Sequence, residues 1–243
     1  MATELKLDRV SSFYVDKKHH RQIVAVDSLS ADFTAPMNVI VGFSGCGKTT
    51  LLRCLLGLKE YEGEIYYQQG NLDELSPKER NFSFVPQDYV LYPSYTVFDN
   101  IAFPLRLMHA EREEILNRVM EVAKLLEITP CLNRKPKHIS GGQQQRTAIA
   151  RALVKRPEVC LLDEPFSNVD PQLRMQTIRV LKSSFAAFGT MGIYVTHDMK
   201  EAMLLADEIF VMEKGKIVCQ GTPSQIYDSF VPAVRDLLQS SEI

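Results

Sequence analysis

The clearest chemistry in the sequence lies in a glycine-rich run at residues 42–50, which reads GFSGCGKTT. The run fits G-x-x-x-x-G-K-[ST], the pattern of a phosphate-binding loop. Its glycines let successive backbone N–H groups point into one concavity, and the helix expected to start there adds partial positive charge. We expect Lys48 to reach the β- and γ-phosphates of a nucleoside triphosphate and the Thr49 hydroxyl to bind Mg²⁺. The residues expected to contact the nucleotide are Gly42, Ser44, Gly45, Cys46, Gly47, Lys48, Thr49 and Thr50.

The context that this pattern requires is also present. An apolar run of strand type at 39–41 precedes the loop, and a helical run at 51–56 follows it. A glycine-rich turn with a solvated lysine is the alternative, but such a turn needs neither element. The sequence therefore predicts a site for a nucleoside triphosphate.

Two adjacent carboxylates, Asp163 and Glu164, follow the uninterrupted apolar run 159–162. A run without alternation is typical of a strand buried on both faces of a parallel sheet. Ligands bind at the carboxyl ends of such strands, so both side chains are expected to face the phosphate-binding loop. We expect Asp163 to contact Mg²⁺ through water and Glu164 to polarise the attacking water. The alternative, in which both residues only cap the next helix, does not explain the nearby phosphate-binding motif.

A second run compatible with phosphate is Ser140-Gly141-Gly142-Gln143, just before an expected helix at 144–154. A serine hydroxyl and glycine N–H groups at a helix start form an anion site. One nucleotide should not need two such sites in one chain, so the run suggests that another copy completes the pocket. An ordinary helix cap is the alternative.

The elements that must position these residues can be predicted from hydrophobic periodicity. Partial alternation predicts two edge strands near the N-terminus, with a solvated hairpin loop between them. From about 88 to 139 the sequence pattern changes from strand-like to helical. Apolar residues at helical spacing over 115–126 predict an amphipathic helix with its apolar stripe in the core. Helical turns are expected from 226 onward. Strands are expected at 5–13, 24–33, 63–67, 82–85, 159–162 and 193–195, with a hairpin at 208–212 and 216–219.

The bulk composition excludes several classes of protein. The chain has 243 residues, 45% hydrophobic and 24% charged, which is ordinary for one soluble globular domain. Its formal net charge of −2 gives no general attraction to nucleic acid or anionic lipid. The five cysteines lack metal-type spacing and are expected as free thiols in a reducing compartment. No signal core or membrane-spanning run is seen, so the chain is expected in the cytoplasm unless a partner holds it at a membrane.

The ordered motifs resemble the ATPase subunit of an ATP-binding cassette (ABC) transporter over nearly the whole chain. The combination of S-G-G-Q with D-E-P downstream is highly specific. The resemblance implies an α/β fold: a P-loop NTPase parallel-sheet core, an N-terminal antiparallel β subdomain and an inserted α-helical subdomain. It implies one domain over 1–243, with the RecA-like core and β subdomain at about 1–87 and 156–243. The helical subdomain would then span about 88–155.

The same resemblance assigns roles to individual residues. Tyr14 is the aromatic that stacks on adenine, Gln87 is the Q-loop glutamine, and His197 is the switch histidine near the γ-phosphate. The run 140–143 becomes the signature that contacts ATP held by the opposite subunit, and Asp170 belongs to the D-loop. The implied catalytic residues are Glu164, His197 and Gln87; the implied Mg²⁺ contacts are Thr49, Gln87 and Asp163; the further nucleotide contacts are Tyr14, Ser140, Gly141, Gly142, Gln143 and Asp170.

The resemblance is greatest to importers of sugars, polyamines, iron or similar solutes. It implies a head-to-tail dimer that hydrolyses Mg-ATP and drives a separate transmembrane permease from the cytoplasmic face of the membrane. The implied partners are permease subunits, a second identical or paralogous ATPase subunit and an extracytoplasmic solute-binding protein, with no nucleic acid. An efflux ATPase is an alternative. A non-transport ABC ATPase would carry coiled-coil insertions or tandem cassettes, and a binding module without turnover would not need both Glu164 and His197.

Some positions depart from the usual family pattern. Phe43 stands where proline is usual and Val169 where leucine is commoner, but neither change removes a phosphate donor. The chain is also expected to lack the C-terminal β-barrel of sugar-importer ATPases, which weakens the assignment of a sugar. The segment 88–98 is dense in aromatic residues. We expect at least one of Tyr89, Tyr92 and Tyr95 to contact the permease, with packing between two lobes as the alternative.

Overall fold

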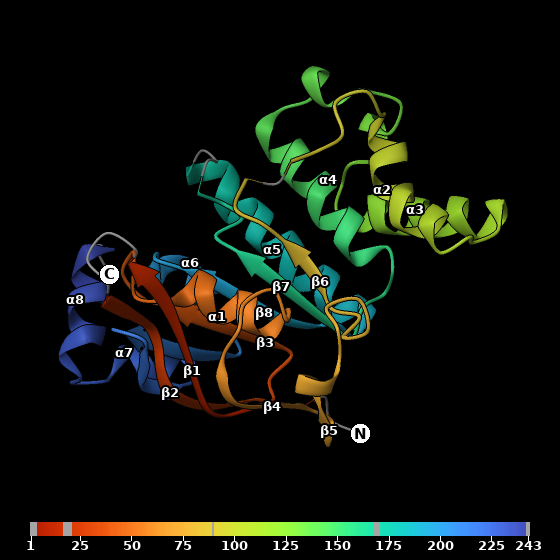
Figure 1. The fold of residues 1–243 in the computed structure, drawn as a ribbon. Coiled ribbons are helices and arrows are strands. Elements are labelled where there is room, and N and C mark those ends of the chain that lie inside the picture. Colours follow the sequence, from red (N-terminus) through yellow and green to blue (C-terminus); the bar gives the residue numbers. More distant parts are fainter. Residues whose placement is uncertain (1–3, 17–20, 89, 168–170, 242–243) are drawn as a thin grey trace. The chain divides into compact units, whose positions relative to one another are not determined.

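The computed structural model of the chain describes residues 4–16, 21–88, 90–167 and 171–241. They belong to two compact units, whose elements are labelled in Figure 1. Unit 1 comprises Met1–Phe82 and Met191–Ile243, and unit 2 comprises Ser83–Thr190. Within the described residues, no helix is both long enough and apolar enough to span a bilayer.

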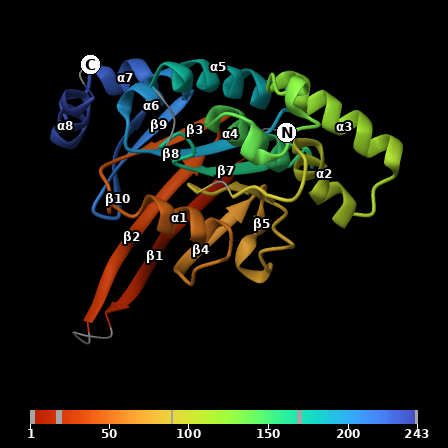
Figure 2. The same cartoon turned by 90° about the horizontal axis from the view of Figure 1, so that it is seen from above.

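Unit 1 contains an antiparallel sheet with its strands in the order β2, β1, β4, β5. Figure 2 shows β1 and β2 as a long pair that runs side by side. The prediction of two edge strands is right for β2 and wrong for β1, which pairs with β4 on its other side. Register shifts between Leu7 and Phe13 interrupt the alternation of β1, so an inner strand has the pattern of an edge strand. The bounds are β1 Leu5–Asp16, β2 Arg21–Phe33, β4 Glu62–Tyr67 and β5 Gly70–Asn71.

A second group of strands in unit 1 lies in the order β10, β9, β3, β8. Strand β3 is parallel to both β8 and β9, whereas β9 and β10 form the predicted antiparallel hairpin. Every residue of β3 and β8 is buried, as expected for central strands of a parallel sheet. The bounds are β3 Met37–Val41, β8 Met191–Thr196, β9 Glu208–Glu213 and β10 Lys216–Gly221; the helices of unit 1 are α1 Lys48–Leu55, η1 Leu72–Glu74, α6 Met199–Leu205, α7 Pro223–Tyr227 and α8 Pro232–Ser240.

The core of unit 1 joins its two groups of strands through aromatic packing. Phe33 of β2 and Phe210 of β9 are fully buried, and their ring centroids lie 4.6 Å apart in an edge-to-face arrangement. A buried pair of this kind contributes about 0.5–1.5 kcal/mol beyond the area that it buries. The contact holds the antiparallel sheet against the strands that carry the glycine-rich loop.

The carboxyl end of α1 is held by Arg80, which is only 8% exposed. Its Nη1 donates to the carbonyls of Cys54 and Leu55, both at 2.9 Å, and its Nη2 donates to the Tyr61 hydroxyl at 3.1 Å. Tyr61 in turn donates to the Asp73 carboxylate. Burial, followed by the hydrogen bond to Asp73, raises the pKa of Tyr61 to about 12. A guanidinium at this position complements the partial negative charge of the helix terminus.

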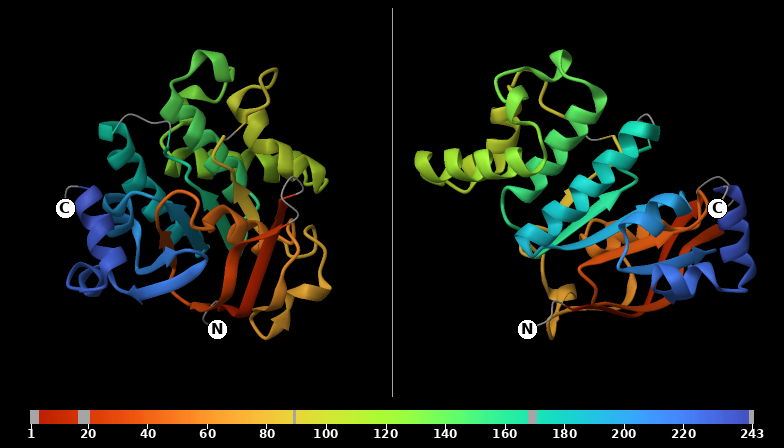
Figure 3. Two further views of the ribbon diagram at one scale, coloured as in Figure 1. Left: turned by 60° about the vertical axis from the view of Figure 1, so that its left-hand side comes forward. Right: turned by 180° about the vertical axis from the view of Figure 1, so that it is seen from behind.

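Unit 2 combines a pair of strands with a group of helices. Strands β6 and β7 are parallel, and every residue of β7 is buried, as the apolar run predicted. The predicted amphipathic helix is also confirmed, because α3 buries Val119, Val122 and Ala123. In Figure 3, α2, α3 and α4 (yellow to green) pack against one another. The bounds are β6 Ser83–Val85, β7 Val159–Asp163, α2 Val97–Leu107, α3 Arg112–Leu125, η2 Thr129–Cys131, η3 Pro136–His138, α4 Gly141–Leu153 and α5 Pro171–Phe188.

Helix α4 begins earlier than predicted. The sequence placed its start at Gln144, but the helix begins at Gly141, with Ser140 as its N-cap. The Ser140 hydroxyl and the Gln143 side chain form a capping box, which draws the two glycines into the first turn despite their low helix propensity. The long helix α5 was not anticipated from the sequence.

Two neighbouring glutamines on α4 allow a test of its packing. Gln144 Nε2 donates to the carbonyls of Pro136 (3.0 Å) and Ile139 (3.4 Å). Gln145 is fully buried, and its amide has no hydrogen-bond partner among the residues that the structure describes. An unsatisfied buried polar group costs on the order of 1–3 kcal/mol.

We therefore expect Gln145→Leu to raise the free energy of unfolding by about 1–2 kcal/mol, because it removes an unpaired amide at similar volume. Gln144→Leu, the matched control, should lower it by about 1 kcal/mol, because two carbonyls lose a donor. Thermal and denaturant unfolding of both variants measure the difference. The account is wrong if Gln145→Leu destabilises the chain more than Gln144→Leu.

Candidate functional site

The glycine-rich loop connects β3 to α1, and its backbone is pressed against two neighbouring strands. A Cβ added to Gly42 would lie 2.2 Å from the carbonyl oxygen of Met212, on β9. Gly47 has φ +112°, and its Cβ would lie 2.1 Å from the carbonyl oxygen of Ala25, on β2. Both positions therefore require glycine. Gly45 also has a left-handed backbone (φ +81°), but a Cβ there would meet nothing within 4 Å, so the middle of the loop faces open space.

Lys48 carries the charge of this loop and is only 5% exposed. Its Nζ donates to the carbonyl of Gly42 at 2.7 Å and to that of Phe43 at 3.1 Å. The first turn of α1 contains no acidic residue, so the positive end of its dipole is not balanced within the helix. A lysine ammonium and a helix N-terminus together make a site for an anion.

Tyr14 lies beside the same helix. Its hydroxyl is 3.2 Å from the Thr50 hydroxyl, and the Lys59 ammonium lies 4.8 Å from its ring centroid. The side chain is 38% exposed, which leaves part of the aromatic surface accessible. The structure thus brings the predicted base-stacking residue to the phosphate-binding helix. Lys59 was not singled out from the sequence, because it follows the end of the helix and belongs to no motif.

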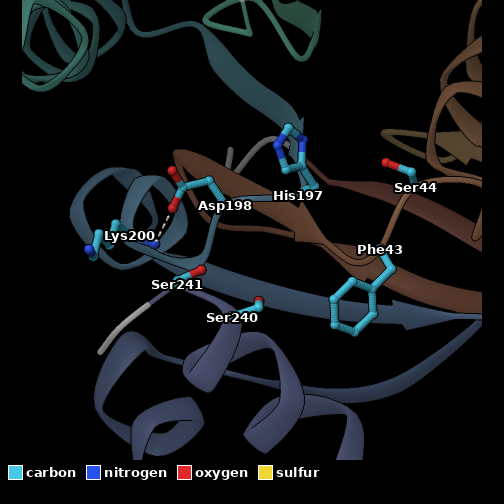
Figure 4. A pocket seen from close by; sticks show the side chains of 7 residues that line it. All are labelled: Phe43, Ser44, His197, Asp198, Lys200, Ser240 and Ser241. Atoms are coloured by element: carbon cyan, nitrogen blue, oxygen red, sulfur yellow. Dashed lines mark hydrogen bonds between the residues drawn. The ribbon is translucent and has the colours of Figure 1, made fainter. Parts of the chain in front are cut away.

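A pocket of about 420 Å³ opens next to the loop (Figure 4). His197 and Ser44 both line it, so the predicted switch histidine and the phosphate-binding loop share one cavity. His197 directly follows β8, and its side chain is exposed. The sequence missed the contribution of α8, because a serine at the end of a helix carries no recognisable signal. The lining residues are Phe43, Ser44, His197, Asp198, Lys200, Ser240 and Ser241.

Unit 2 holds the two predicted carboxylates at the end of β7. Asp163 is the last residue of the strand and is 5% exposed, and Glu164 follows it, half-buried. Glu164 has φ +39°, a left-handed conformation that is rare for a residue with a side chain. Such strained residues are found preferentially at functional sites. The carboxylate of Asp163 offers hard oxygen donors of the kind that Mg²⁺ prefers.

The signature run occupies the N-terminus of α4. The Ser140 hydroxyl accepts from the Gln143 N–H at 3.3 Å, and the Gln143 side-chain oxygen accepts from the Ser140 N–H at 3.1 Å. The predicted helix cap is therefore present, and it leaves the exposed turn around Gly141 accessible to an anion. Gln87 is exposed and lies two residues after β6. Asp170, assigned to the D-loop, falls outside the described residues, as do Tyr89 and Val169.

The five cysteines are free thiols, as predicted. Complete burial raises the pKa of Cys160 on β7 to about 12. Burial also raises the pKa of Cys54 on α1. Both groups stay protonated at neutral pH and contribute packing rather than nucleophilic chemistry.

Comparison with known proteins identifies the family to which the sequence is similar. The sequence model of the family described as "ABC transporter" matches residues 33–167. The trehalose/maltose import ATP-binding protein MalK of Thermococcus litoralis is 45% identical over 215 residues, which cover 85% of this chain and 58% of MalK. The sn-glycerol-3-phosphate import ATP-binding protein UgpC of Pectobacterium atrosepticum is 43% identical over 224 residues, which cover 92% of this chain. The chain spans 58% and 62% of the lengths of these two relatives.

The fold also matches a solved structure. The dimeric structure of a post-hydrolysis state of the ATP-binding cassette MJ0796, bound to ADP and Pi, superposes with a TM-score of 0.78 at 29% identity. The match covers 90% of this chain and 98% of that one. The predicted α/β cassette fold of the P-loop NTPase type is therefore confirmed.

Proposed function

Because the chain belongs to the ABC transporter family, we propose that it hydrolyses ATP and couples the reaction to solute import through a separate permease. The observation that carries the proposal is the phosphate-binding loop, with Tyr14 beside its helix and His197 lining its pocket. The two relatives, both named as import ATP-binding proteins, favour import over efflux.

The chain's own residues would bind the nucleotide from two sides. The Lys48 ammonium would exchange the Gly42 and Phe43 carbonyls for phosphate oxygens, and the N–H groups at the start of α1 would bind the same anion. The Tyr14 ring would stack on the base, an interaction that contributes about 1–3 kcal/mol elsewhere. Stacking by Phe13 is the alternative.

Mg²⁺ would be held by the Thr49 hydroxyl, with Asp163 reached through water and Gln87 as a further oxygen donor. The metal, when bound, neutralises charge that develops on the phosphate oxygens. Glu164 would accept a proton from the attacking water, and His197 would hydrogen-bond the γ-phosphate. The left-handed backbone of Glu164 is a strained conformation of the kind found at functional sites, which favours a role in chemistry over helix capping.

Glu164→Gln tests the hydrolytic role directly. The amide keeps the shape of the side chain but cannot accept the proton, so we expect turnover to fall by roughly 10²–10⁴-fold while ATP affinity stays within about twofold. The matched control is Glu158→Gln, an exposed carboxylate at the opposite end of β7. Single-turnover hydrolysis and nucleotide titration separate the two effects. Near-normal turnover in Glu164→Gln would rule out this residue as the base.

We propose further that two copies of the chain, or this chain and a paralogue, complete each site together. The signature turn of α4 would contact the triphosphate held by the other copy. The dimeric form of the MJ0796 cassette supports this arrangement.

A mixed-dimer experiment distinguishes shared from separate sites. Lys48→Ala and Ser140→Arg should each be inactive as homodimers, because every pocket then lacks one element. In an equimolar mixture, about half of the dimers are mixed if exchange is random, and each mixed dimer has one intact pocket. We expect recovery of about a quarter of wild-type activity, and no recovery from verified mixed dimers contradicts the shared site.

The permease is proposed to dock at an aromatic cluster in unit 2. The Tyr92 ring lies 4.8 Å from Phe103 and 5.4 Å from Tyr95. Arg151 lies 5.4 Å from the Tyr92 ring, and desolvation lowers the pKa of this arginine. Both tyrosines keep accessible surface, 40% for Tyr92 and 37% for Tyr95. Tyrosines that are neither buried nor isolated suit a protein interface.

Tyr92→Ala and Tyr95→Ala should keep basal ATPase and lose co-purification with a polytopic membrane protein from native membranes. Tyr227→Ala, on α7 in unit 1 and 53% exposed, is the control for loss of an exposed tyrosine. Thermal unfolding verifies that each variant is folded. Full retention of the membrane protein by both variants rules out Tyr92 and Tyr95 as the docking surface.

The solute is set by other subunits in this proposal. The two relatives are almost equally similar to the chain, yet they are named for trehalose/maltose and for sn-glycerol-3-phosphate. Similarity of the ATPase therefore does not select a solute. The permease and an extracytoplasmic solute-binding protein would supply specificity, with this chain on the cytoplasmic face of the membrane. A non-transport ABC ATPase is disfavoured by both relatives.

A further inference from the structure

The mechanism proposed above makes no use of Glu201, a carboxyl group that is only 3% exposed. It lies on α6, the helix that follows His197. One of its oxygens, Oε2, accepts two hydroxyl hydrogen bonds, from Tyr194 at 2.6 Å and from Thr196 at 2.7 Å. Burial of a carboxyl group is costly unless hydrogen bonds compensate, so this side chain is held in a defined position.

Thr196 connects Glu201 to the candidate site. It is the last residue of β8, directly before His197, and is 2% exposed. Its hydroxyl donates to Glu201 and accepts from the Asp198 N–H at 3.0 Å. The second bond joins the residues on either side of His197. Its carbonyl accepts from the Gly42 N–H at 3.3 Å, at the start of the phosphate-binding loop.

The turn that carries His197 is also fixed on its other side. Asp198 Oδ1 accepts from the Lys200 N–H at 2.8 Å, a bond drawn in Figure 4. The Ser241 hydroxyl, beyond the end of α8, accepts from the Met199 N–H at 3.1 Å. Hydrogen bonds therefore hold the backbone both before and after His197. Glu201 is the buried acceptor for Thr196, the residue before His197.

We propose that Glu201 is a positioning residue: through Thr196 it sets the place of the His197 imidazole relative to the phosphate-binding loop. The proposal rests on the proposed ATPase function. Glu201 does not touch the nucleotide in this account, and it acts through one hydroxyl. A geometric error of about 1 Å at a reacting group can reduce a rate by roughly a hundredfold. The energetic importance of Glu201 therefore lies in turnover rather than in nucleotide affinity.

The test compares two pairs of variants. Thr196→Val removes the bridging hydroxyl at similar volume, and Thr196→Ser keeps it. Glu201→Leu removes the acceptor, and Glu201→Gln keeps an acceptor oxygen in the same place. We expect Thr196→Val and Glu201→Leu to lower kcat by roughly ten- to a hundredfold with KM for ATP within about twofold. The conservative variants should restore most of the rate.

Tyr194→Phe separates positioning from packing, because it removes the hydrogen bond from Tyr194 to Glu201 and leaves Thr196 in place. It should lower thermal stability without lowering kcat. If Tyr194→Phe reduces kcat as much as Thr196→Val does, Glu201 acts through general packing and the proposal fails. If Glu201→Leu does not fold, the Thr196 pair and Tyr194→Phe still decide the outcome.

A readout without turnover keeps this inference separate from the proposed function. The imidazole resonances of His197, identified by their loss in His197→Ala, should shift in Thr196→Val and keep their wild-type positions in Tyr194→Phe. Unchanged resonances in Thr196→Val overturn the positioning role. A wild-type chain that does not hydrolyse ATP overturns the proposed function, while the resonances still report whether Thr196 and Glu201 position the histidine.

Discussion

Close packing of the phosphate-binding loop against its neighbours is the constraint on which the rest of unit 1 depends. The backbone at Gly42 leaves no room for a side chain beside Met212, and that at Gly47 leaves none beside Ala25. The Cys46 carbonyl also accepts from the Gly215 N–H at 2.9 Å, in the turn between β9 and β10. The loop is thus packed against β2, β9 and the turn between β9 and β10, by contacts that need no ligand. A loop that is already ordered loses less conformational entropy when an anion binds.

The charges on α1 explain why this loop favours an anion. Arg80 caps the carboxyl end of the helix, so the negative end of its dipole is matched. The amino end carries a second cation, Lys48, at the positive pole, with no acidic residue in the first turn. Two positive contributions, the Lys48 ammonium and the positive pole of the helix dipole, therefore add at one end of the helix. A polyphosphate carries several negative charges and complements this end of the helix.

The sequence predicted the elements whose signals are local. The buried runs of β7 and β8, the glycine-rich loop and the cap at Ser140 all depend on neighbouring residues, and each is present in the structure. The inner position of β1 was missed, because strand order depends on β4, far away in the chain. Ser140 was expected as a cap, but the helical conformation of residues 141–143 was missed, because a capping box outweighs the low helix propensity of two glycines. The contacts of Glu201 had no local signal either, because the sequence alone does not distinguish a buried glutamate on a short helix from a solvent-exposed one.

Two features have a local cost in folding free energy, and both lie where the proposed chemistry takes place. At the end of β7, Glu164 adopts φ +39°, which costs about 1–2 kcal/mol for a residue with a side chain. Glycine would remove that strain, but it would also remove the carboxylate. After β8, Glu201 buries a carboxyl group, whose desolvation cost must be offset by the hydroxyl hydrogen bonds from Tyr194 and Thr196. Each becomes intelligible if the end of its strand must hold one side chain in a fixed direction, Glu164 toward water and His197 toward a phosphate.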